Sequence, residues 1–558
     1  MESNYWQRYL KQRSERRLGR RSLLRYGAFA SAGLAATALV GCGDDDDDDD
    51  STSTPAGASP QATATTAPAV RGGTLKFALN RDVQGLDPAK VTDSYVGFIF
   101  IGGLYDGLIN YTNDYQVGAG LAEKWETPDA TTINLTIRQG VKFHDGEPLN
   151  AAAVKANLDR VIAQGSTAKD KASLAALASI TAVSENQVQL KLKNPDNVVL
   201  PLLGDYAGLM ASPKAFETLQ TNPVGTGPMK FKSWEKGSKV VLEKNPAYWG
   251  KASDGGALPY LDGFEFVVIP DLEQQINSLK TGQVHLLTLI TGDTITRIKG
   301  DSNLQYVSGP SRLLRTMFLN MAWPGLERLE VRQAMSQAVD RNALIGAAYA
   351  GFAKPAATLG TPGDWVFDSS IEQYKYDVAN AKKLLSAAGY ENGLKIQVKT
   401  TGAPGEFQTV LDVVKPQLKQ AGIEVEYETI DPTAAFQLIY REGKTAINIA
   451  GNDGRADFGQ VADVFMAVGG GLNLTSAYDK SWKLDTEIEG LMTKGRQTLA
   501  QAERKTIYKD LQKQIRDKVY NQNVLAYPEQ GWAASKKVSN LKWYQDARFR
   551  LHEVSLQS

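Results

Sequence analysis

Few residues in this chain of 558 have side chains placed for chemistry. Cys42 is the only cysteine, and the three histidines, His144, His285 and His552, do not stand at the spacing of metal ligands. The sequence contains no G-x-S-x-G, G-x-x-x-x-G-K-[ST] or H-E-x-x-H motif. We expect the histidines to have surface or packing roles. The pattern favours a binding protein over an enzyme, and it predicts no metal site and no cofactor.

Cys42 ends an N-terminal segment that has the features of an export signal. A basic segment with Arg20 and Arg21 precedes an apolar stretch from Tyr26 to Val40. This order is typical of secretory signals, and the paired arginines favour the twin-arginine route in a bacterium. The ending Leu39-Val40-Gly41-Cys42 resembles a lipoprotein box, which predicts that Cys42 carries a lipid and anchors the protein to a membrane. A buried cysteine in an ordinary helix is the alternative.

The residues after Cys42 have the composition of a tether. Asp44 to Asp50 are seven consecutive aspartates, and residues 51–69 are mainly Ser, Thr, Ala, Pro and Gly. Such segments cannot bury a core, and like charges repel. The sequence therefore predicts a signal peptide at 1–41, a lipidated and disordered tether at 42–70, and a folded body from Arg71. A calcium site in the aspartate run is the alternative, but it lacks turns or glycines to wrap an ion.

The folded body is close to electrically neutral. Residues 1–41 hold eight Lys/Arg and two Asp/Glu, and the aspartate run adds seven acidic residues; of the 62 residues of each sign, 54 basic and 53 acidic therefore remain. This balance gives no footprint for nucleic acid. The 488 residues from Arg71 are enough for two or three domains, each with its own core.

Strand and helix patterns alternate along the body and predict an α/β protein. Apolar residues recur at every second position in three predicted strands, and at helical spacing in a helix that Asn150 would cap. The predicted segments are a strand at 72–78, a strand at 132–138, a helix from 151 to 162, a strand at 188–192 and a helix face from 331 to 339.

The clearest unit is a strand, helix and strand between Leu394 and Ile430. The strands alternate around Ile396 and Val425, and a helix between them ends at Gly422. This spacing predicts a right-handed crossover that joins two parallel strands. Pro416 is expected to kink the helix. Its predicted apolar face consists of Phe407, Val410, Leu411, Val414 and Leu418.

Four groups of short segments, spread along the body, together resemble the sequence motifs of a known protein family. They are Gly73–Leu75 with Leu86–Ala89 and Leu104–Leu108; Leu121–Trp125 with Leu135–Arg138 and Val141–Pro148; Pro223–Pro228 with Lys244–Trp249; and Phe318–Asn320 with Glu330–Ala334 and Ala338–Arg341. Together they resemble the solute-binding proteins of ABC importers, in the peptide/nickel-type family 5 that includes dipeptide- and oligopeptide-binding proteins. Individually these segments are most simply interpreted as turns and packing residues.

This resemblance implies a two-lobed periplasmic-binding-protein type II fold with an extra domain inserted in the first lobe. Mapped by the motifs, lobe I would comprise 71–107, 200–309 and 528–558. The inserted subdomain would be 108–199, and lobe II would be 310–527. The resemblance also implies an extracytoplasmic monomer that delivers its solute to the transmembrane subunits of an ABC permease.

The resemblance suggests one ligand contact in lobe II. Peptide-binding members carry an aspartate in an Ala-Asp-aromatic segment that pairs with the ligand's amino group, and Ala456-Asp457-Phe458 matches it. The usual upstream tryptophan and downstream Asp/Glu-Pro are missing, so a surface or capping role for Asp457 is the alternative. Arg455 and Asp453 are further candidates. If Asp457 is a ligand contact, we expect its carboxylate to lie open on the cleft surface.

Other functions remain open from the sequence. The same fold could bind an oligosaccharide through stacked aromatic residues such as Trp365, Trp482 or Trp532, or it could bind a metal chelate. An exported enzyme is a third possibility. An open carboxylate at Asp457 favours a cationic or amino-bearing ligand, and the scattered histidines disfavour direct metal binding.

Overall fold

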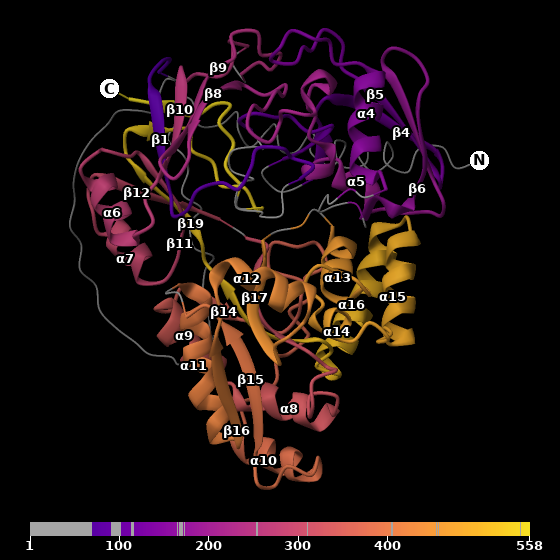
Figure 1. Ribbon diagram of the computed structural model, residues 1–558, viewed down its shortest axis with the longest axis vertical. Coiled ribbons are helices and arrows are strands. Elements are labelled where there is room, and N and C mark those ends of the chain that lie inside the picture. The colour runs from indigo at the N-terminus through magenta and orange to yellow at the C-terminus, as the bar shows by residue number, and fades with distance from the viewer. Residues whose placement is uncertain are drawn as a thin grey trace, which may run out of the picture.

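A computed structural model describes the chain from Val70 to Gln557. Within this range it leaves out 91–101, 113–115, 165, 167–170, 172, 253–254, 310, 403–404, 454, 456 and 547. The predicted export signal with Arg20 and Arg21, the lipidation site Cys42 and the tether lie outside the described residues. The body has two lobes, one above the other in Figure 1. This confirms the predicted α/β, two-lobed fold.

Lobe I is built on a seven-stranded mixed sheet with the order β12-β19-β11-β1-β10-β9-β8. The central strand β1 is parallel to both β10 and β11, whereas β9 and β19 are antiparallel to their neighbours. Aromatic side chains fill the core, where Phe77 contacts Phe266 and Trp532. The elements are β1 (Thr74–Leu79), β8 (Met229–Glu235), β9 (Lys239–Lys244), β10 (Gly263–Val268), α6 (Leu272–Lys280), β11 (Leu286–Ile290), α7 (Asp293–Lys299), β12 (Leu304–Ser308) and β19 (Gly531–Ser535).

A smaller antiparallel sheet, with the order β4-β5-β7-β6, packs with α4 beside lobe I; we call this part the insert. Alternate residues of β5 and β7 are buried, as their sequence pattern predicts. The Asn150 side chain accepts a hydrogen bond from the Ala153 amide and caps α4. The elements are β2 (Ile109–Tyr111), β3 (Val117–Ala119), β4 (Ala122–Asp129), β5 (Thr132–Ile137), α4 (Ala151–Ile162), β6 (Leu177–Ala182), β7 (Gln187–Leu192) and α5 (Val199–Leu202).

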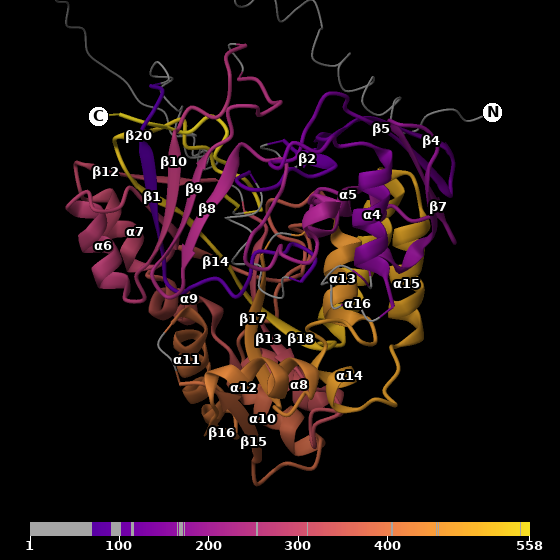
Figure 2. The ribbon, with the colours of Figure 1, turned by 45° about the horizontal axis from the view of Figure 1, so that its top comes forward.

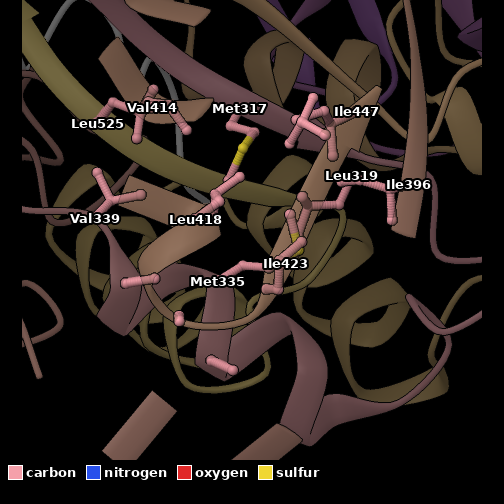
Figure 3. Close-up of a cluster of buried hydrophobic side chains, with 14 of the residues drawn as sticks. Met317, Leu319, Met335, Val339, Ile396, Val414, Leu418, Ile423, Ile447 and Leu525 are labelled. Carbon is pink, nitrogen blue, oxygen red and sulfur yellow. The ribbon is translucent and has the colours of Figure 1, made fainter. Parts of the chain in front are cut away.

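Lobe II combines a four-stranded sheet, β14-β18-β13-β17, with the parallel pair β15-β16. Its core draws apolar residues from segments far apart in sequence, including Met317, Met335, Ile396 and Leu525 (Figure 3). The strands are β13 (Leu313–Leu319), β14 (Ala353–Pro355), β15 (Leu394–Thr400), β16 (Ile423–Thr429), β17 (Ile447–Asp453) and β18 (Gln522–Pro528). The main helices are α8 (Leu329–Ala338), α9 (Arg341–Tyr349), α10 (Val378–Ala387), α11 (Glu406–Gln420), α12 (Pro432–Phe436), α13 (Phe458–Met466), α14 (Leu474–Tyr478), α15 (Thr486–Gln497) and α16 (Gln501–Asp517).

The predicted crossover unit is present as β15, α11 and β16, with the two strands parallel and in register from Leu394 opposite Ile423. Gly422 has a φ of +99°, as expected at a helix C′ position. The prediction for Phe407 is wrong, because its side chain is 46% exposed. Phe407 lies in the first turn of α11, where the Arg315 guanidinium covers its ring at 5.2 Å, and the core begins with Val410.

Two connections join the lobes within the described part of the chain. The chain leaves the large sheet after β12 and enters lobe II at β13, and it returns from β18 to β19. Paired crossings of this kind are where hinge motion between two lobes can take place. Among the residues from 70 to 557 that are described, no helix has the length and apolar character to cross a membrane.

Candidate ligand-binding site

Three of the family-like segments meet at the Asp106 carboxylate. Tyr248 Oη donates to Asp106 Oδ1 at 3.1 Å, and Trp249 Nε1 donates to Oδ2 at 2.8 Å. Thr226 Oγ1 donates to the same Oδ2 at 3.2 Å. The carboxylate thus ties the Leu104–Leu108, Pro223–Pro228 and Lys244–Trp249 segments together. These hydrogen bonds confirm that the segments pack against one another, as the sequence predicts.

His144 has a packing role in the same region. Its Nδ1 accepts from the Gly225 amide at 3.2 Å, and its Nε2 lies 3.0 Å from the Gly227 carbonyl oxygen. A neutral ring protonated at Nε2 satisfies both contacts. Burial lowers the pKa of His144 to about 4, against 6.5 for a free side chain. The ring is therefore neutral at physiological pH and holds the Gly225–Gly227 turn against the insert.

A cavity of about 260 Å³ lies beside Asp106. Tyr248 and Trp249 line it together with C-terminal residues that include Lys542 and His552. Lys542 pairs with Glu553 at 2.8 Å, and His552 Nε2 lies 3.9 Å from Asp106 Oδ1. The cavity is large enough for a side chain or a small solute. The sequence did not point to it, because its walls come from separate segments up to about 450 residues apart.

Asp457 lies at the start of α13, and the structure corrects the expected exposure of its carboxylate. The residue is only 4% exposed. Its Oδ1 accepts from the Gly459 amide at 2.8 Å, which caps the helix, and from Arg504 Nη2 at 2.7 Å. The expectation of an open carboxylate is therefore wrong in this conformation. The partner is on α16, 47 residues later, where no sequence pattern links it to Asp457.

Arg504 is held firmly in this buried pair. Its Nε donates to the Gly495 carbonyl oxygen at 2.9 Å, and the guanidinium lies 5.1 Å from the centre of the Trp365 ring. Burial acts to lower the pKa of Arg504, but the Asp457 carboxylate outweighs it, so the pKa lies above its usual value. The contacts of Asp457 fall on Oδ1, and within the described residues Oδ2 accepts no hydrogen bond.

The other two predicted contacts, Asp453 and Arg455, precede Asp457 in the sequence. The Arg455 carbonyl oxygen accepts from Arg312 Nη1 at 3.0 Å, and Arg312 also pairs with Asp364 at 3.0 Å. Arg455 is half-buried. Asp453 ends β17 opposite Leu313 of β13, and its side chain lies outside the described residues. The three candidates thus lie between the end of β17 and the start of α13, next to the point where the chain enters lobe II.

The aromatic residues proposed for sugar binding differ in accessibility. Trp532 is completely buried in the core of lobe I, so it cannot stack on a solute. Trp482 packs against Tyr520, and Trp365 packs against Tyr508. Among the described residues no group of three or more His, Cys, Asp or Glu side chains is arranged to hold a metal ion.

The fold and these contacts define a two-lobed binding protein, and comparisons with known proteins identify its family. Residues 116–466 match the family "Bacterial extracellular solute-binding proteins, family 5 Middle". The chain belongs to this family. It is 30% identical over 369 residues to the glutathione-binding protein GsiB of Salmonella typhi, which covers 65% of this chain and 71% of that protein.

Solved structures give the same result. The periplasmic binding protein DppA of Helicobacter pylori, in complex with the peptide STSA, superposes with a TM-score of 0.78 at 25% identity, over 88% of this chain and 99% of that one. AgaA of Agrobacterium tumefaciens R10, in complex with agropinic acid, gives 0.77 at 25% identity, over 87% and 99%. The named relatives are binding proteins, in agreement with the lack of catalytic motifs in this sequence.

Proposed function

We propose that this protein captures a peptide-like solute between its lobes and delivers it to the permease of an ABC importer. The observation that carries the proposal is its close structural similarity to DppA in complex with a peptide. The name of the glutathione-binding relative points to the same class of solute. The two connections between the lobes provide the hinge that such capture needs. In this proposal the protein acts outside the cytoplasm as a monomer, and a lipid on Cys42 holds it at the membrane surface.

We further propose that Asp457 Oδ2 accepts a hydrogen bond from the amino group of the solute. The supporting observation is that Arg504 and the helix cap use Oδ1, which leaves the second oxygen available in the described structure. The start of α13 lies close to the first lobe, since a Cβ atom on Gly459, two residues after Asp457, would lie 2.8 Å from Val198 Cγ2. Asp453, at the end of β17, and Arg455, between β17 and α13, would line the approach to this carboxylate.

A second candidate is a small organic acid that is not a peptide. AgaA, which binds agropinic acid in its crystal, is as similar to this chain as the peptide-binding DppA. The cavity beside Asp106, with Lys542 and His552 in its wall, has polar groups that could recognise such a solute. The same fold serves both ligands, so the fold does not decide between them.

Native mass spectrometry of the freshly purified chain tests the proposal. We expect an added mass that fragments into amino acids, and that peptides such as Ser-Thr-Ser-Ala or glutathione displace. A non-peptide mass displaced by agropinic acid would favour the second candidate. If no mass co-purifies and neither peptides nor acids bind, the proposed function is wrong.

A further inference from the structure

The first lobe and lobe II also meet at a set of side-chain and backbone contacts outside the two connecting segments. Figures 1 and 2 show α13, α15 and α16 of lobe II next to α4 and α5 of the insert. Arg496, the penultimate residue of α15, lies between two carboxylates. Its Nη2 and Nε are 2.5 and 3.2 Å from Oδ2 of Asp196 in the first lobe, and its Nη1 pairs with Asp463 of α13. The side chains of Asp196 and Arg496 are 7% and 17% exposed.

Asn197 adds hydrogen bonds to the C-terminus of the same helix. Its Nδ2 donates to the carbonyl oxygens of Arg496 and Thr498 at 3.0 and 2.5 Å, and its backbone amide donates to the carbonyl oxygen of Arg496 at 3.0 Å. The last carbonyl groups of a helix have no partner within the helix. A residue of the first lobe therefore caps a helix of lobe II, and separation of the lobes would remove this cap.

Val198 completes the contact next to the candidate site. A Cβ atom on Gly459 would lie 2.8 Å from Val198 Cγ2 and 3.1 Å from Asp457 Oδ1. The absence of a side chain at Gly459 thus allows the first lobe to approach the start of α13. The Asp196 Oδ1 atom accepts from the Val198 amide at 2.8 Å, which fixes the shape of this short loop.

We propose that the loop Asp196–Val198 is an interlobe latch. It binds α15 through Arg496 and the helix cap, and it places Val198 over the start of α13, beside Asp457. The latch holds the lobes together and slows the release of a solute. Arg496 and Asn197 are positioning residues, because they act on the lobes and not on the solute. The part of the inference that concerns solute release rests on the proposed function, whereas the part that concerns the lobes does not.

Fluorescence energy transfer in the solute-free full chain tests the latch. In a Cys42→Ser background, dyes are placed by Val183→Cys in the insert and Val468→Cys in lobe II, both more than half exposed. Arg496→Met and Asp196→Asn each remove the charge from one side of the pair. Both variants should shift the population of molecules towards lower energy transfer, which indicates separated lobes. Arg496→Lys keeps the positive charge and should therefore lose less energy transfer than Arg496→Met. Arg297→Met is the matched control, because Arg297 pairs with Glu273 inside lobe I at 2.6 Å.

Solute release gives a second readout. With Ser-Thr-Ser-Ala as the probe, Arg496→Met should raise the dissociation rate by about tenfold and change the association rate much less. Unchanged energy transfer in both Arg496→Met and Asp196→Asn overturns the latch, and so does an unchanged dissociation rate in both variants. If the parent chain binds neither Ser-Thr-Ser-Ala nor glutathione, the proposed function fails, while the energy-transfer result still decides whether the lobes are latched.

Discussion

The buried pair between Asp457 and Arg504 should make lobe II sensitive to a single substitution. Both side chains are 5% exposed and 2.7 Å apart. Arg504→Met keeps the aliphatic stem but leaves the Asp457 carboxylate buried without its cationic partner. Removal of one member of such a pair costs about 3–5 kcal/mol. In a lobe of roughly 200 residues, even a loss of about 3 kcal/mol lowers the melting temperature by about 6–12 °C.

Urea denaturation followed by calorimetry measures this effect. Arg297→Met again serves as the control, since its partly exposed ion pair should contribute at most about 1 kcal/mol. The double variant Asp457→Asn with Arg504→Met should be more stable than Arg504→Met alone, because the unpaired charge is then absent. A loss below about 1 kcal/mol in Arg504→Met would show that the carboxylate is hydrated and that the described pair does not hold α13 to α16.

Four other predictions concern pH, membrane anchoring, export and recognition. The pKa of His144 is about 4 in the folded chain and 6.5 in a free side chain, so the unfolded state binds more protons between these values and stability falls as the pH drops from 6.5 to 4. The His144→Gln variant should lose up to about 3 kcal/mol of this pH-dependent change in the free energy of unfolding, measured by urea titrations. An unchanged dependence of the unfolding free energy on pH would contradict the prediction. Cys42→Ser should release the protein from the membrane fraction of a native host, and Lys at both Arg20 and Arg21 should leave precursor in the cytoplasm; normal fractionation would refute either. N-acetylation of Ser-Thr-Ser-Ala should weaken its binding to the parent by about 30-fold but add little loss in Asp457→Asn, whereas equal losses in calorimetry would remove the carboxylate from the site.

Local patterns in the sequence were sufficient to predict much of the fold. The alternation in β5 and β7, the Asn150 cap and the crossover from β15 to β16 all depend on residues close together in the chain. The error at Phe407 has a local cause as well. Its position fits the apolar face of α11, but at the first turn that face extends past the core, and the ring packs under Arg315.

The site could be predicted only in part, because its contacts are long-range. Asp457 was found through a short motif, but the motif does not show that Arg504 occupies one of its oxygens. Asp196 and Arg496 are 300 residues apart, and each looks like an ordinary surface charge in the sequence. The residues that line the cavity beside Asp106 likewise come together only after the C-terminal segment returns to lobe I.

The central claim is that this chain captures a peptide-like solute, and isothermal titration calorimetry tests it most directly. The full chain, freed of co-purified solute, is titrated separately with Ser-Thr-Ser-Ala, glutathione and agropinic acid. Closure of the lobes around a peptide predicts saturable one-to-one binding of at least one of the two peptides, with a negative heat-capacity change from buried apolar surface. Binding of agropinic acid with no heat from either peptide would contradict the claim.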